Sequence, residues 1–269
     1  MKIAFIGGGV MAEAIISGLI NKGSASPEDI TVSDIVQIRL AELKARYGIQ
    51  TATENREATI GRDVVIIAVK PQSISKVADS LRGKLQPEQL LLSIMAGVKI
   101  DTLNLLLTHR SIVRVMPNTP AQIGEGISVW TATDSVRQPL KDMAQTILAA
   151  LGQEIYVEEE KYIDMATAVS GSGPAYVFLI IEALINAAVH IGLPRTAASE
   201  LVLQTILGST RFVQASGKHT AELRDMVTSP GGTTAAGLLC LEEGSLRAVL
   251  TQAVVAAYER AQSLGKEQK

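Results

Sequence analysis

The sequence predicts an α/β protein, with a doubly wound parallel sheet first and an all-helical C-terminal domain after it. Strand-like and helix-like segments alternate in the first half, which is typical of a parallel sheet with crossover helices. From about Lys161 onward every periodic segment is helical. We therefore predict a sheet domain over residues 1–158 and a helical domain over residues 159–269, with the acidic run Glu158–Glu160 as a solvated linker.

Short apolar runs mark the strands of the first domain. Several are continuously apolar, as expected for strands that helices cover on both faces. The predicted strands are Lys2–Ile6, Ile30–Asp34, Asp63–Val69, Leu90–Met95 and Ser111–Met116, with Ile127–Thr131 and Glu154–Val157 as candidates to extend the sheet. Helical periodicity predicts helices over Met11–Asn21, Gln37–Tyr47 and Gln72–Leu81.

The second domain is a succession of helical patterns, over Tyr162–Ile191, Pro194–Ser216, Thr220–Val227, Thr234–Leu241 and Ser245–Leu264. Within Ala175–Ile191 the polar residues Glu182, Asn186 and His190 recur at every fourth position, and the rest is apolar nearly all round. Such a helix needs burial on more than one side, and a domain of this size offers little core. We expect a second copy of the chain to cover it, in a homodimer or a larger homo-oligomer built from dimers. A central helix of a monomeric bundle is the alternative.

Composition argues against several classes of partner. The formal net charge is −2 and Lys and Arg form no blocks, so neither nucleic acid nor a membrane surface is expected as a partner. The single Cys240 suits a reducing compartment, and we recognise no export signal or apolar stretch of ~18 residues. His109, His190 and His219 lack metal-ligand spacing. We expect a soluble, cytoplasmic protein that holds no metal.

The first predicted strand runs directly into a glycine-rich loop that opens a helix. The segment Ile6, Gly7, Gly8, Gly9, Val10, Met11 and Ala12 matches G-x-G-x-x-G/A. Gly7 permits the tight turn, Gly9 lets the backbone approach a pyrophosphate, and Ala12 lets the helix pack against the strand. The N–H groups at the start of that helix would face the pyrophosphate. The context predicts a Rossmann-type, dinucleotide-binding sheet rather than a plain glycine turn.

An acidic residue ends the second predicted strand. Asp34 follows the glycine loop by about 20 residues, where an acidic side chain binds the adenosine ribose and repels a 2′-phosphate. The next arginine is Arg39, while Ser33 offers a hydroxyl to a phosphate. The pattern favours NADH and leaves NADPH open; an ordinary strand-end aspartate is the alternative.

Further candidates follow the other strands, because strand carboxyl ends border the ligand crevice of a doubly wound sheet. Lys70 ends Ala68-Val69-Lys70-Pro71, and a solvated lysine is equally compatible with its position. The same reasoning applies to the segment Met95–Val98 and to Met116–Pro120, in which two prolines fix a polar loop.

Two segments interrupt the helical pattern of the second half. Ser170-Gly171-Ser172-Gly173-Pro174 should kink or restart a helix, and Ser229-Pro230-Gly231-Gly232-Thr233-Thr234 opens one. Backbone donors and hydroxyls at a helix N-terminus suit a carboxylate. Simple interhelical turns are the alternative for both.

These segments together resemble the pyrroline-5-carboxylate reductase family over essentially the whole chain. The resemblance is carried by Phe5–Ala12, Ala68–Pro71, Met116–Pro120, Ser170–Tyr176 and, as the most specific signature, Glu222–Thr234. It implies a Rossmann domain followed by a helical domain that interlocks with a second subunit. Val10 stands where many members have Asn, and Asp34 stands where NADPH-preferring members often have a neutral residue.

The resemblance also implies roles for individual residues. The dinucleotide, NADPH or NADH, would be bound by Ile6–Ala12, Asp34, Asn55, Ala68, Val69, Lys70, Pro71, Ala96 and Gly97. The substrate, 1-pyrroline-5-carboxylate, would be held by Ser229, Gly232, Thr233 and Thr234, with Thr234 as the key catalytic contact. The implied reaction is reduction of this cyclic imine to L-proline, the last step of proline biosynthesis.

Two rival functions remain open at this point. A 3-hydroxyacid dehydrogenase of similar build needs a base for the alcohol proton, usually a lysine of the helical domain, for which only Lys161 and Lys218 are candidates. A dinucleotide-sensing protein without turnover is the second rival. In an NAD(P)H oxidation assay with pyrroline-5-carboxylate, steady oxidation would indicate the reductase, and cofactor binding without turnover would indicate the sensor.

Overall fold

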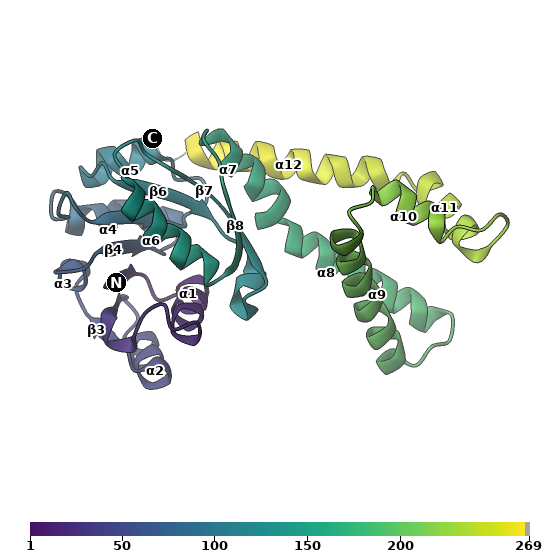
Figure 1. Cartoon of the computed structure of the whole chain (residues 1–269), viewed down its shortest axis with the longest axis horizontal. Coiled ribbons are helices and arrows are strands. Elements are labelled where there is room, and N and C mark those ends of the chain that lie inside the picture. The colour runs from purple at the N-terminus through teal and green to yellow at the C-terminus, as the bar shows by residue number, and fades with distance from the viewer. Residues whose placement is uncertain (267–269) are drawn as a thin grey trace. The chain divides into compact units, whose positions relative to one another are not determined.

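The computed structural model describes residues 1–266, and within them eight strands form one sheet (Figure 1). The strands are β1 (Ile3–Ile6), β2 (Ile30–Ser33), β3 (Gln50–Ala52), β4 (Val64–Ile67), β5 (Leu90–Ser93), β6 (Ile112–Met116), β7 (Gly126–Ala132) and β8 (Gly152–Tyr156). Their order is β3-β2-β1-β4-β5-β6-β7-β8. The first six are parallel, β7 is antiparallel to β6, and β8 is parallel to β7. The predicted doubly wound sheet is thus confirmed.

Helices connect the strands and cover both faces of the sheet. They are α1 (Val10–Asn21), α2 (Gln37–Tyr47), α3 (Asn55–Thr59), α4 (Ile74–Leu81), α5 (Ile100–Leu107) and α6 (Gln138–Ala149). The short 3₁₀ turns are η1 (Pro27–Asp29), η2 (Pro71–Ser73) and η3 (Thr119–Ile123). The helix predicted from Gln72 begins at Ile74 because the chain first makes the turn η2, with Pro71 in its first position.

One strand and three helices of the first half, β3, α3, α5 and α6, were not predicted from the sequence. β3 is a three-residue edge strand with no fully buried residue, so it carries no apolar signal. α3 has only five residues, too few to show a helical period. The missed helices α5 and α6 do show a pattern, since their buried residues (Leu103 and Leu107; Ala144, Ile147 and Leu148) recur at helical spacing.

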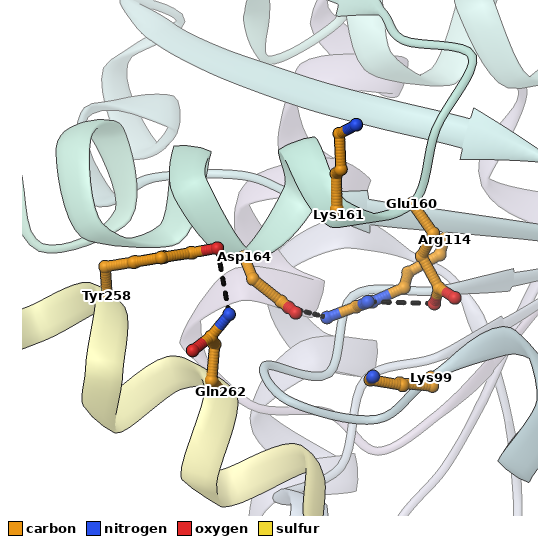
Figure 2. Close-up of a pocket in the computed structure, with 7 residues that line it drawn as sticks. All are labelled: Lys99, Arg114, Glu160, Lys161, Asp164, Tyr258 and Gln262. Atoms are coloured by element: carbon orange, nitrogen blue, oxygen red, sulfur yellow. Dashed lines mark hydrogen bonds and ion pairs between the residues drawn. The ribbon is translucent and has the colours of Figure 1, made fainter.

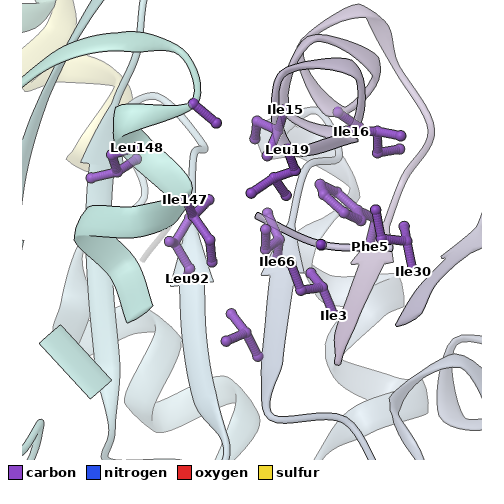
Figure 3. Close-up of a cluster of buried hydrophobic side chains, with 14 of the residues drawn as sticks. Ile3, Phe5, Ile15, Ile16, Leu19, Ile30, Ile66, Leu92, Ile147 and Leu148 are labelled. Atoms are coloured by element: carbon purple, nitrogen blue, oxygen red, sulfur yellow. The ribbon is translucent and has the colours of Figure 1, made fainter. Parts of the chain in front are cut away.

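Two aliphatic core layers lie on opposite faces of the sheet. One layer packs α1, α2 and α6 against side chains such as Phe5, Ile66 and Leu92 (Figure 3). The other packs α4 and α5 against side chains such as Ile6 and Ile67. Because successive strand residues point to opposite faces, continuously apolar strands supply both layers. This double burial fixes the strand ends that form the site.

The second half contains α7 (Lys161–Ala166), a π-helical turn η4 (Thr167–Gly171), α8 (Gly173–His190), α9 (Arg195–Ser216), α10 (Thr220–Met226), α11 (Thr233–Glu243) and α12 (Leu246–Lys266). The helical pattern predicted over Tyr162–Ile191 is interrupted at Thr167–Gly171, close to the segment Ser170–Pro174 where a kink or restart was predicted. At the π turn, a Cβ on Gly171 would lie 2.6 Å from Cε of Met116, so a larger residue there would require the end of the Met116 side chain to move. The helix is widened there rather than ended, and Ser172 N–H still donates to Thr167 O at 2.8 Å.

The chain forms two compact units: Met1–Pro174 together with Ala256–Lys269, and Ala175–Val255. The first unit extends beyond residue 158 because α7 packs on β6 and β7. It also includes the end of α12, where Leu264 contacts Gly97. The change from strands to helices does lie near residue 158. Our division into domains at that residue stays a prediction.

The helical run Lys161–His190 is long and apolar enough to cross a membrane, by length and composition only, and the structure buries 6% of its most apolar window. This run was not identified from the sequence, because we looked for uninterrupted apolar stretches and Glu182 interrupts this one. The same run contains the polar stripe that starts at Glu182. Among the described residues of α8 none is buried, and Phe178 and Leu179 are 61% and 66% exposed. An exposed apolar surface of this kind is typical of an interaction site.

Candidate active site

The glycine loop has the backbone geometry that a pyrophosphate requires. Gly7 adopts φ +100°, and a Cβ there would lie 2.9 Å from the carbonyl oxygen of Ala68. Gly9 is the N-cap of α1, and a Cβ built on it meets nothing within 4 Å. No side chain of the described chain caps α1. The N–H groups at the start of this helix therefore border open space in which an anion fits.

Asp34 lies at the end of β2 beside this loop. Its Oδ2 accepts a hydrogen bond from Gly8 N–H at 2.7 Å, and its Oδ1 accepts one from Val36 N–H at 2.9 Å. The carboxylate thus holds the glycine loop against β2. Each oxygen retains acceptor capacity for a ribose hydroxyl, so the predicted contact with the cofactor stays a prediction alongside this structural role.

Ser33 does not play the role that its position suggested. The side chain is fully buried, and its Oγ donates to Asn55 Oδ1 at 2.8 Å. Asn55 in turn donates from Nδ2 to Ser80 Oγ at 3.0 Å. A hydroxyl buried and bonded in this way cannot receive a phosphate, so that expectation was wrong. Asn55, the first residue of α3, thus holds the end of β2 in place through its hydrogen bond with Ser33.

The other predicted cofactor residues follow β4 and β5, at the same edge of the sheet as the glycine loop. Ala68 N–H donates to Ile6 O at 2.8 Å, because β4 pairs with β1. Lys70 is exposed and Pro71 opens η2. Gly97, at φ +75°, is buried after β5, where a Cβ would lie 3.0 Å from Cβ of Leu264. β1 lies between β2 and β4, where the strand order changes direction, and this is the ligand crevice of doubly wound sheets.

The predicted substrate segment forms a tight turn before α11. Gly231 adopts φ +69°, and Gly232 N–H donates to Ser229 O at 3.0 Å. Gly232 is the N-cap of α11, and a Cβ there would collide with Oγ of Ser229. Thr233 and Thr234 are therefore the first two residues of the helix, and neither caps it. The turn joins backbone donors and two hydroxyls at a helix N-terminus, which suits a carboxylate.

Comparisons with known proteins agree with this geometry. Residues 160–264 match the family model of the pyrroline-5-carboxylate reductase dimerisation domain, and residues 2–97 match a model of coenzyme F420-dependent NADP oxidoreductases. A pyrroline-5-carboxylate reductase of Synechocystis is 41% identical over 267 residues, which cover 99% of both chains. The chain belongs to the pyrroline-5-carboxylate reductase family.

Solved structures of this family have the same fold. The reductase from Coxiella burnetii superposes with a TM-score of 0.89 at 39% identity, covering 98% of both chains. The Plasmodium falciparum enzyme, solved with NADP bound, superposes with a TM-score of 0.90 at 35% identity, again covering 98% of both chains. The predicted family and fold class are therefore confirmed.

The lysines that a hydroxyacid dehydrogenase would need do not have the properties of a base. Lys161 is exposed, and its Nζ lies 2.6 Å from a carboxylate oxygen of Glu159. This pairing raises the pKa of Lys161, which keeps the amine protonated. Lys218 is also exposed and lies against Met226. A general base must be neutral and within reach of the alcohol, so the structure gives this rival no support.

A buried ion-pair network in the first unit was not predicted. Arg114 of β6 is 1% exposed, and its guanidinium lies 2.8 Å from Glu160 and 2.6 Å from Asp164 (Figure 2). Glu160 also accepts a hydrogen bond from Ile100 N–H at 2.8 Å. Glu160 is thus a structural anchor between β6, α7 and the start of α5, and its interpretation as part of a solvated linker was wrong. An arginine inside an apolar strand was the available signal.

The same network lines a polar cavity of about 200 Å³. Its other lining residues are Lys99, Lys161, Tyr258 and Gln262, and Tyr258 accepts a hydrogen bond from Gln262 (Figure 2). The cavity combines the cations of Lys99 and Lys161 with two carboxylates that share the guanidinium of Arg114.

Proposed function

We propose that this chain reduces 1-pyrroline-5-carboxylate to L-proline by hydride transfer from NADPH or NADH, as the last step of proline biosynthesis. The observation that carries the proposal is the identity of 41% with a pyrroline-5-carboxylate reductase over 99% of both chains. The glycine loop and the Gly232–Thr234 turn support it, since they supply a pyrophosphate site and a carboxylate site. The enzyme is accordingly an NAD(P)H-dependent oxidoreductase.

The nicotinamide cofactor supplies the hydride, so the protein needs few groups of its own for this step. N–H groups around Gly9 would bind the pyrophosphate. Lys70, exposed just after β4, stands at the crevice edge where a cofactor phosphate or the substrate would pass. Asp34, at the end of β2, would bind the adenosine ribose.

The substrate carries one carboxylate and one imine nitrogen. Ser229, Gly232 and Thr233 would hold the carboxylate by backbone N–H groups and hydroxyls. The Oγ1 of Thr234 would bond the ring nitrogen and fix which face of the imine meets the hydride. A protonated imine accepts hydride at its ring carbon, and the C=N electron pair then remains on nitrogen. A site without an acidic histidine or lysine is therefore sufficient.

The functional unit is a homodimer, or a larger homo-oligomer of dimers, joined through the helical half. The exposed apolar surface of α8 supports this assembly, and so does the family model of residues 160–264. Coverage by a second copy accounts for the apolar run Lys161–His190 in a soluble protein. We place the protein in the cytoplasm, with no nucleic acid or membrane as partner.

The deciding experiment follows NADH or NADPH absorbance at 340 nm, the ordinary wavelength of this assay, with and without pyrroline-5-carboxylate. Steady oxidation with stoichiometric proline formation is expected. Cofactor binding without oxidation would instead indicate a dinucleotide sensor. Reduction of NAD(P)⁺ by 3-hydroxyacids, with no activity on the imine, would indicate the dehydrogenase.

A further inference from the structure

A cluster of charged residues lies beside the glycine loop, and no role for it follows from the reaction. Glu13, in the first turn of α1, forms an ion pair with Arg39 of α2. Its other oxygen lies 2.6 Å from Nη1 of Arg46 and accepts a hydrogen bond from Tyr47 Oη at 2.9 Å. We call Glu13, Arg39, Arg46 and Tyr47 the Glu13 cluster. Two arginines thus converge on one carboxylate.

The position of the cluster relates it to the cofactor. Nε of Arg39 donates to the carbonyl oxygen of Gly8 at 2.7 Å, while Gly8 N–H donates to Asp34. Arg39 is therefore adjacent to the loop and to the end of β2. In doubly wound folds this place receives the adenosine ribose, and an arginine nearby accommodates a 2′-phosphate when the cofactor is NADP.

Both arginines of the cluster are already paired with carboxylates. Burial raises the pKa of Glu13, but hydrogen bonds from Arg39 and Tyr47 and the charge of Arg39 outweigh it, so the net pKa is lowered and Glu13 is ionised at neutral pH. Arg39 also pairs with Glu42 at 3.2 Å. The acidic groups Glu13, Asp34 and Glu42 thus outnumber Arg39 and Arg46 at this end of the sheet.

We propose that Glu13 is a specificity-determining residue for the cofactor, because it binds Arg39, the arginine beside the glycine loop that a 2′-phosphate would otherwise engage. The inference rests on the proposed use of NADH or NADPH at this site. Asp34 would repel the phosphate directly, and Glu13 would act by holding Arg39 away from it. NADH is favoured by both effects.

The test is the change Glu13→Gln, which keeps the shape and an acceptor oxygen but removes the charge. Dissociation constants for NADH and NADPH are measured by the fluorescence of the reduced nicotinamide, with no substrate present. We expect the NADPH-to-NADH affinity ratio to rise at least ~3-fold, as for release of a partly solvated ion pair. In the double variant Glu13→Gln/Arg39→Gln this gain should disappear, since Arg39 would no longer be available.

Glu42→Gln is the matched control, because Glu42 pairs with the same arginine but is far more exposed (58% against 18% for Glu13). It should change the ratio less than ~2-fold. An unchanged ratio in Glu13→Gln, with circular dichroism and Tm close to wild type, would overturn the inference. An equal shift in Glu42→Gln would overturn it as well, since that is a general effect of net charge. If the wild type binds neither dinucleotide, the proposed function itself fails, and the two failures are distinguishable.

Discussion

The Oδ2 atom of Asp34 and the backbone nitrogen of Gly8 are 2.7 Å apart, and the N–H of Gly8 donates to the carboxylate. The carbonyl of the same glycine accepts from Arg39. Gly8 is therefore fixed at both ends of its backbone by side chains that follow β2. Asp34 therefore supports the glycine loop and is also a candidate determinant of cofactor choice. The first role would affect the affinity for both cofactors, and the second would affect the ratio between them.

Asp34→Ser should shift the cofactor preference toward NADPH. Repulsion of a 2′-phosphate at a partly solvated site is worth on the order of 1–3 kcal/mol. Loss of the bond to Gly8 should also weaken binding of both cofactors. Steady-state kinetics and fluorescence titration measure the ratio, with Asp29→Ser before β2 as control. A wild type that strongly prefers NADPH, with no movement of the ratio in the variant, would exclude Asp34 from this role.

Thr234→Ala should reduce catalytic efficiency more than stability. Loss of one well-placed polar group typically costs about 1.5–4 kcal/mol of transition-state stabilisation, or ~10- to 1000-fold in kcat/KM. Since Gly232 rather than Thr234 caps α11, the change should leave Tm and NADH affinity close to wild type. Thr220→Ala, at the first position of α10, is the control and should stay fully active. A destabilised but fully active Thr234→Ala would assign this residue a structural role only.

Ala188→Glu should weaken association of the subunits. Ala188 lies on α8, and a glutamate there would place an unpaired charge in the proposed interface. Sedimentation velocity at low micromolar concentration should give a dimer or larger species for the wild type and a smaller one for the variant. The same change at the exposed Ala149 of α6 should have no effect. A wild type that sediments as a stable monomer contradicts the assembly.

Arg114→Met should destabilise the first unit strongly. The variant leaves the carboxylates of Glu160 and Asp164 without their shared cation, and breaking a buried pair in this way costs about 3–5 kcal/mol. Urea denaturation followed by circular dichroism measures the change in free energy of unfolding. Arg110→Met, at an exposed position before β6, is the control and should cost well under ~1 kcal/mol. A loss no larger than in this control would mean that the network contributes little to stability.

His109 should make stability depend on pH just below neutrality. Burial lowers the pKa of His109 below its ordinary value of 6.5, against opposing hydrogen bonds to the backbone of Gln89 and Ser111. The folded state therefore keeps the ring neutral. As pH falls below 6.5 the unfolded state takes up a proton first, so stability present above 6.5 is lost. Between pH 7.5 and 5.5, the Tm of His109→Gln should fall less than that of the wild type. Parallel Tm curves would contradict this assignment.

The elements of the fold that have a clear local sequence pattern could be predicted. Continuous apolar runs indicated strands buried on both faces, and α2 has the predicted bounds, Gln37–Tyr47. The edge strand β3 was not predicted, because it has three residues and an edge strand does not need to be apolar. The interruption at Gly171 was visible as a glycine-rich segment, but its form as a π turn was not predicted.

The sequence by itself determined the glycine loop, the apolar strands and the signature segment Glu222–Thr234, because each is a local pattern whose spacing has one chemical meaning. Tertiary structure alone decided which side chains meet. Glu13 bonds Arg39, which lies 26 residues away in the sequence, and Arg114 bonds Asp164, which lies 50 residues away. The buried hydroxyl of Ser33 bonds Asn55. No period or motif encodes such pairs. They form because sheet order brings distant strand and helix ends together, and because buried charges and hydroxyls must find partners there.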